Sequence, residues 1–103
     1  MKYCYCNKHD KNIFRLVVIR EDGKFDFANI KDCNAFLNQT NEKPLELNSG
    51  NVYLPYIKTA IFNDNGSVII TFFDDDGHEN TQTIFGKEAI AVSQFVLNHK
   101  CDE

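Results

Sequence analysis

The chain has 103 residues with a net charge of −4, and 43% of them are hydrophobic and 13% aromatic. This length and hydrophobic content predict one domain, residues 1–103, that buries its own core. No apolar run approaches the roughly 18 residues of a membrane span, and the start of the chain lacks the apolar stretch of a secretion signal. We therefore expect a cytoplasmic protein with no membrane contact. Its acidity argues against direct nucleic-acid binding and favours a basic protein partner.

The first third of the chain predicts three short strands. Residues 2–6 alternate tyrosine with cysteine, and 13–20 alternate two largely apolar faces. Asp22-Gly23 is a hairpin-turn dipeptide, and it leads into 24–28, where Phe25 and Phe27 share a face.

A helix of about ten residues is predicted after these strands. Asn29 followed three residues later by Asp32 resembles a capping box, and apolar residues recur at helical spacing. Those apolar residues are Ile30, Cys33, Phe36 and Leu37. The polar segment 40–44 ends the helix.

The middle of the chain is harder to interpret. Residues 45–47 predict a short strand before a turn at 48–50. Pro55 interrupts the next run, 52–57, which is either an edge strand or a bulge.

Residues 59–86 predict a three-stranded meander. Asn65-Gly66 and Asp76-Gly77 are dipeptides typical of type I′ hairpin turns, and each lies between runs of β-branched and aromatic residues. The middle run, 68–73, is apolar on both faces, which favours a central or doubly covered strand. The last run, 80–85, alternates like a half-exposed edge strand.

The second predicted helix, 87–100, is apolar around most of its circumference. Such a helix favours packing against the sheet and a second element, or against another copy of the chain. The predicted fold class is therefore α+β, with an antiparallel sheet of about five to seven strands, three hairpins and two helices.

Acidic residues concentrate in the meander. Between residues 59 and 86 there are five acidic residues and no Lys or Arg. Four of them, Asp74, Asp75, Asp76 and Glu79, surround one turn and form the predicted partner-binding site. An EF-hand is excluded because Phe72 and Thr83 would occupy ligand positions, but loose cation binding by the turn stays open.

Cysteine and histidine residues cluster at the two ends of the chain. Cys4, Cys6 and His9 have zinc-ligand spacing, and His99 and Cys101 lie at the other end, so the sequence leaves open whether the five meet around zinc. Without a secretion signal, reduced thiols and no cofactor are the expectation. No nucleophile-base pair and no phosphate-binding glycine motif stands out, so we expect no enzyme activity.

A small, acidic α+β domain with Asn- and Asp-rich hairpins resembles the immunity proteins that bacteria pair with secreted toxins, such as those of contact-dependent growth inhibition. The resemblance lies in size, charge and architecture, and it implies a cytosolic inhibitor that blocks a cognate toxin, often a basic nuclease domain. Two alternatives are a phage-encoded inhibitor of a host nuclease and a structural module that self-associates through 87–100. A zinc or thiol enzyme is a third.

Overall fold

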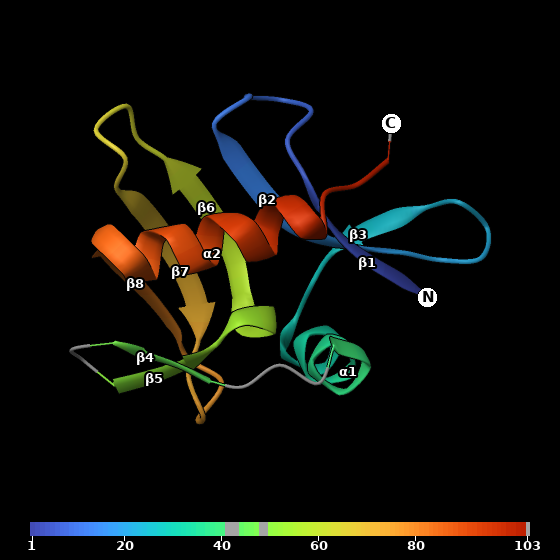
Figure 1. Ribbon diagram of the computed structural model, residues 1–103. Coiled ribbons are helices and arrows are strands. Elements are labelled where there is room, and N and C mark those ends of the chain that lie inside the picture. The colour runs from blue at the N-terminus through green and yellow to red at the C-terminus, as the bar shows by residue number, and fades with distance from the viewer. Residues whose placement is uncertain (41–43, 48–49, 103) are drawn as a thin grey trace.

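The computed structural model describes residues 1–40, 44–47 and 50–102 (Figure 1). The elements in chain order are β1 (Lys2–Cys6), β2 (Ile13–Ile19), β3 (Phe25–Phe27), α1 (Ile30–Thr40), β4 (Pro44–Leu47), β5 (Gly50–Tyr53), a 3₁₀ turn η1 (Leu54–Tyr56), β6 (Ile57–Phe62), β7 (Val68–Phe73), β8 (Glu79–Ile84) and α2 (Gly86–Asn98).

Six strands form the main sheet, in the order β1-β2-β6-β7-β8 with β3 paired to β2, and every pairing is antiparallel. β4 and β5 form a separate two-stranded sheet. The predicted α+β class and the meander β6-β7-β8 are thus confirmed, with β7 between β6 and β8 and with β8 at the edge. None of the helices in the described chain is long and apolar enough to cross a membrane.

β2 changes partner halfway along one of its edges. Residues 13–15 pair with β6, whereas 17–19 pair with β3. Leu16 lies between the two pairings, and its carbonyl oxygen accepts the Ala28 N–H at 3.1 Å. The sheet therefore forks at Leu16, with β3 on one branch and β6 on the other.

The three predicted hairpins form, but their turns are not the expected two-residue type I′ turns. In each, the glycine N–H donates to the carbonyl oxygen three residues earlier: Gly23 to Arg20, Gly66 to Asn63 and Gly77 to Asp74. The φ angles of these glycines are 84°, 87° and 82°. This pattern matches a three-residue loop in which a turn is followed by a left-handed glycine. The glycine therefore closes the loop instead of standing at its centre.

The predicted capping box at the start of α1 is confirmed. The Asn29 backbone N–H donates to the Asp32 carboxylate at 2.9 Å, and the Asp32 N–H donates to the Asn29 side chain at 3.0 Å. Of the predicted break, Thr40 still belongs to the helix and 41–43 lie outside the described residues.

The segment around Pro55 corrects the sequence interpretation. Pro55 lies in η1, which separates β5 from β6, so it belongs neither to an edge strand nor to a bulge. The predicted strand 45–47 is β4, which begins one residue earlier at Pro44. Of the predicted turn 48–50, residues 48–49 lie outside the described residues.

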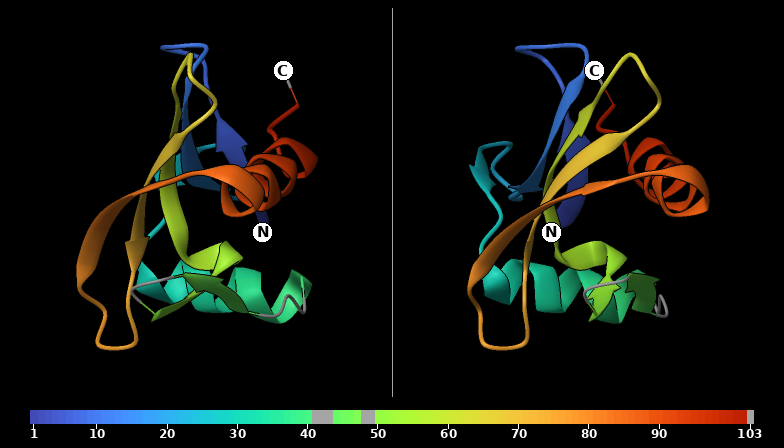
Figure 2. Two further views of the ribbon diagram at one scale, coloured as in Figure 1. Left: turned by 60° about the vertical axis from the view of Figure 1, so that its left-hand side comes forward. Right: turned by 90° about the vertical axis from the view of Figure 1, so that its left-hand side faces the viewer.

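α2 lies along one face of the sheet, and α1 crosses below the end of the sheet (Figure 2). Phe36 of α1 and Phe95 of α2 meet with ring centroids 5.7 Å apart, and both rings contact Tyr5 of β1. The α2 residues buried against the sheet are Ala89, Val92, Phe95 and Val96. Ile90 and Leu97 are more than half exposed, so α2 has a solvent-exposed face that its sequence did not predict.

The cysteines correct a second expectation. Cys4 and Cys101 form a disulfide, so the prediction of four reduced thiols is wrong for this pair. Cys6 and Cys33 are free. The residues after α2 lie beside β1, where the Tyr5 N–H donates to the His99 carbonyl oxygen and the Cys101 N–H to that of Tyr5. The two ends of the chain are therefore joined side by side.

Candidate functional site

Asp74 holds the predicted acidic turn in shape. One carboxylate oxygen accepts the backbone N–H groups of Asp76 and His78, both at 2.9 Å. The other oxygen accepts the Asn80 side-chain amide at 2.9 Å. These bonds, that of Asn80 foremost, hold the pKa of Asp74 below its usual value. Asp74 is thus a structural residue of the turn and not a free charge.

Asp75 and Asp76 are the outward-facing members of the predicted site. Both are exposed, and within the described part of the chain neither carboxylate takes part in an ion pair. Because Asp74 fixes the loop that carries them, the two charges are presented on a rigid support. They form the part of the predicted site that is open to a partner.

Glu79, the fourth residue of the predicted site, is paired within the chain. Its carboxylate forms an ion pair with Lys58 of β6, one residue before the segment that contains no Lys or Arg. The Lys58 ammonium also lies 5.0 Å from the centroid of the Phe73 ring. The charge of Glu79 is therefore offset within the chain, and the acidic site is reduced to Asp75 and Asp76.

The turn also brings together three potential metal ligands. Asp74, Asp76 and His78 offer ligand atoms within 4.8 Å of one another. Asp74 Oδ1 accepts two backbone N–H groups and Oδ2 accepts the Asn80 amide, so both oxygens also hold the turn. Three protein ligands are fewer than the six to eight oxygens that calcium takes.

The residues considered for zinc are only partly brought together. The Cys4–Cys101 disulfide removes two thiolates, and the His99 ring Nδ1 lies 2.9 Å from the Phe95 carbonyl oxygen. Cys6 is half-buried and lines one depression with Cys101 and another with His9, which is exposed in the loop before β2. The disulfide thus explains why the two ends of the chain carry cysteine.

Cys33 lies apart from this cluster, on the buried side of α1. Burial raises the pKa of its thiol to about 12, with a further contribution from Asp32. At neutral pH it is a protonated thiol, which is a poor nucleophile and a poor metal ligand.

The face of the sheet opposite α2 has no helix of the described chain lying along its strands (Figure 2). The cross-strand pairing places Arg15, Thr59, Thr71 and Thr81 in one row across β2, β6, β7 and β8. Phe25 and Phe27 of β3 lie on the same face and are 55% and 61% exposed. We call this surface the open face.

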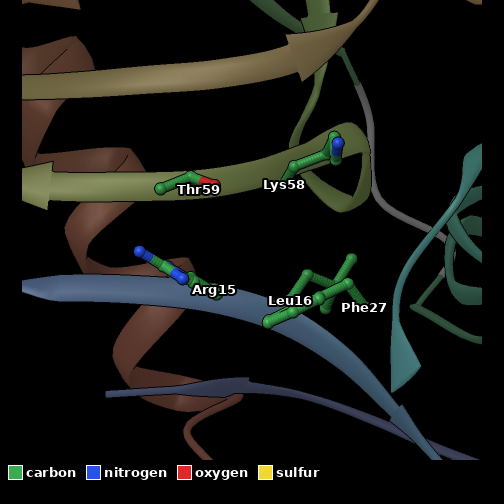
Figure 3. A pocket seen from close by; sticks show the side chains of 5 residues that line it. All are labelled: Arg15, Leu16, Phe27, Lys58 and Thr59. Carbon is green, nitrogen blue, oxygen red and sulfur yellow. The ribbon is translucent and has the colours of Figure 1, made fainter. Parts of the chain in front are cut away.

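A depression of about 290 Å³ lies where the sheet forks, lined by Arg15, Leu16, Phe27, Lys58 and Thr59 (Figure 3). We call it the fork pocket. A β-bulge in β6 helps to build it, because Ile57 pairs with Phe72 and Thr59 with Thr71, which leaves Lys58 as the extra residue. A bulge turns consecutive side chains toward the same side of a sheet. Both Lys58 and Thr59 accordingly line the pocket.

Two cations meet at this pocket. The Arg15 guanidinium lies 6.0 Å from the centroid of the Phe27 ring. Lys58 forms an ion pair with Glu79, whereas Arg15 forms no ion pair with any of the described residues. One positive charge at the fork pocket is therefore left without a carboxylate.

The sequence did not predict the fork pocket. Its five residues come from three strands, and Arg15 and Lys58 are 43 positions apart in the chain. The available signal was Arg15 itself, a charged residue in a strand face otherwise made of Ile13, Val17 and Ile19.

Comparison of the chain with models of protein families, with curated proteins and with solved structures gave no match.

Proposed function

We propose that this chain is a non-enzymatic inhibitor that binds a basic protein partner through the acidic turn. The observation that carries the proposal is the exposure of Asp75 and Asp76 on a loop held by three hydrogen bonds to Asp74. A rigid pair of carboxylates complements a cleft that binds phosphate through Lys and Arg. The resemblance to immunity proteins implies that the partner is a cognate toxin with a nuclease domain.

The proposed partner should carry positive charge at its active site, because it is a nuclease. A nuclease lines its active site with cations that neutralise substrate phosphates. Asp75 and Asp76 would occupy these phosphate positions, so that binding and inhibition are one event. The inhibitor then needs no catalytic group of its own.

The decisive experiment compares Asp75→Asn/Asp76→Asn with Asp64→Asn, which changes an acid in the other turn of the meander. Binding to the toxin encoded beside this chain is followed by biolayer interferometry over a range of salt concentrations. We expect the double variant to associate more slowly and to show a flatter salt dependence. If both carboxylates are desolvated against cations, affinity falls by about 2–5 kcal/mol. Asp64→Asn should bind like the wild type.

Two results would contradict the proposal in different ways. If the neighbouring gene product does not bind, the pairing with a cognate toxin is wrong. If it binds the double variant with unchanged affinity and salt slope, and circular dichroism shows a folded protein, the acidic turn is not the binding site.

The disulfide bears on the compartment in which the protein acts. The sequence predicts a cytosolic inhibitor, but cytosolic thiols are normally kept reduced, and the Cys4–Cys101 disulfide favours an oxidising location. We propose that the chain acts where this disulfide persists. Rapid alkylation of cells before lysis, followed by mass spectrometry, should find Cys4 and Cys101 unmodified. Alkylation of both cysteines would show that they are reduced in the cell, which would favour the cytosol as the compartment.

A second candidate function is self-association through α2. Ile90 and Leu97 are seven residues apart, which puts them on one side of the helix, and they are 58% and 54% exposed. Light scattering tests this function. A dimer that dissociates on Leu97→Glu would support it, whereas a monomer at high protein concentration would exclude it.

A further inference from the structure

The fork pocket has the composition of a binding site for an anionic group. It offers a guanidinium, an ammonium, a hydroxyl and an aromatic ring. Arg and Lys bind oxyanions through charge-assisted hydrogen bonds, and the planar guanidinium matches two oxygens at once. The residues that line the fork pocket are not part of the acidic turn.

The fold holds Lys58 in place and sets the position of Arg15 in the sheet. Lys58 is the bulged residue of β6 and is fixed by Glu79 and the Phe73 ring. Arg15 lies on β2 directly opposite Thr59 and beside the Phe27 ring. A ligand would therefore meet a largely preorganised site, which lowers the entropy cost of binding.

The charge at the pocket selects the class of anion. Glu79 offsets one of the two cations, so a single positive charge is left. A carboxylate carries one negative charge, whereas a phosphate monoester carries about 1.5 to 2 at neutral pH. The exposed Phe27 ring, 61% accessible, supplies a surface for an apolar or planar group next to the anion.

We propose that the fork pocket binds a carboxylate attached to an apolar or aromatic group. The Arg15 guanidinium and the Thr59 hydroxyl hold the oxygens, and the Phe27 ring packs against the body of the ligand. The same chemistry is offered by a small aromatic acid and by the C-terminal residue of a peptide.

The test uses benzoate as the probe, followed by amide NMR spectra of the full chain. We expect benzoate to shift the amide signals of Arg15, Phe27 and Thr59 in a saturable way. Benzamide, which has the same shape without the charge, should bind at least about tenfold more weakly, the scale of one charge-assisted interaction. Phenyl phosphate should bind no more tightly than benzoate.

Variants of Arg15 and of Arg20, which lies five positions further along the chain, separate the site from general charge effects. Arg15→Gln should weaken benzoate binding by about tenfold or more. Arg20→Gln removes the same charge outside the pocket, from a residue paired with Asp26, and should change binding by less than about twofold. A peptide ending in phenylalanine, with its amidated form as control, shows whether a chain terminus is accepted as well as a small acid.

Three results would overturn the proposal. The first is equal binding of benzamide and benzoate by the wild type, which needs no variant. The second is unchanged benzoate affinity of a folded Arg15→Gln. The third is tighter binding of phenyl phosphate, which would assign the pocket to a different anion.

Discussion

At the scale of single residues, neighbouring acids in one turn have different roles. Asp74 accepts three hydrogen bonds within its loop, whereas Asp75 and Asp76 face solvent. Glu79, in the strand that follows, is paired with Lys58. Four acids that look equivalent in the sequence thus divide into a structural residue, two free charges and one ion-paired residue.

Asp74 should make folding stability depend on pH. Its pKa is lowered in the folded chain, so its contribution is complete above the unfolded carboxyl pKa of about 3.9 and is lost as pH falls through the folded pKa. We expect Asp74→Asn to melt at a lower temperature than the wild type at neutral pH. The difference should shrink as the solution is acidified below about pH 4. Thermal unfolding by circular dichroism measures both, and Asp75→Asn, which leaves the turn bonds intact, is the control.

The two free thiols should differ in reactivity. Burial raises the pKa of Cys33 to about 12, so almost none of it is thiolate at neutral pH, whereas Cys6 is only half-buried. Mass spectrometry after brief treatment with iodoacetamide should find one label on the native protein, at Cys6. Unfolding without reductant should add the second label, at Cys33. Early labelling of Cys33 would contradict its place in the core.

At the scale of elements, the two helices and the strand edges decide what is exposed. α1 and α2 meet through Phe36 and Phe95 over Tyr5, which closes the core on one face of the sheet. The bulge at Lys58 and the divided edge of β2 form the fork pocket on the opposite face of the sheet. Each face follows from strand pairing and not from the composition of any one strand.

The inner side of α2 should carry most of its contribution to stability. Phe95 is 4% exposed and contacts Tyr5, Phe36 and His99, so Phe95→Ala should lower the free energy of unfolding by about 3–5 kcal/mol. Leu97→Ala, on the exposed side of the same helix, should change it by no more than about 0.5 kcal/mol. Urea unfolding gives both values if the m value is unchanged. Equal effects would mean that α2 is packed differently.

At the scale of the whole molecule, the ends of the chain are tied together. The disulfide joins residues 97 positions apart, and Lys2 and Asp102 form an ion pair at 2.8 Å. Two backbone hydrogen bonds connect β1 to the residues after α2. β1 and α2 are therefore held to the same core from both ends of the sequence.

Opening the disulfide should destabilise the fold strongly. Closing a loop of this length restricts the unfolded chain, and loss of such a bond typically costs about 2–5 kcal/mol. Cys101→Ser should therefore unfold at a lower urea concentration, and adding reductant to the wild type should have the same effect. Cys6→Ser serves as the control, since Cys6 is free and half-buried. Equal stability of Cys101→Ser and wild type would show that the bond contributes nothing.

Local patterns in the sequence were enough to identify most elements. The capping box at Asn29, the glycine of each hairpin and the two-faced apolarity of 68–73 act over a few residues, so neighbouring side chains determine them. The exact turn type was wrong because an Asn-Gly or Asp-Gly pair suits both a two-residue and a three-residue loop. The prediction for Pro55 was wrong because the φ angle of proline is compatible with a 3₁₀ turn as well as with an edge strand.

Contacts between distant parts of the chain were decided by the tertiary structure alone. The pairing of Cys4 with Cys101, of Lys58 with Glu79 and the fork at Leu16 each join segments that no local pattern connects. The sequence by itself therefore determined the fold class and the position of the acidic turn. Which of its charges are free, and where a carboxylate would meet Arg15, depend on strand order, because strand order sets which side chains become neighbours across the sheet.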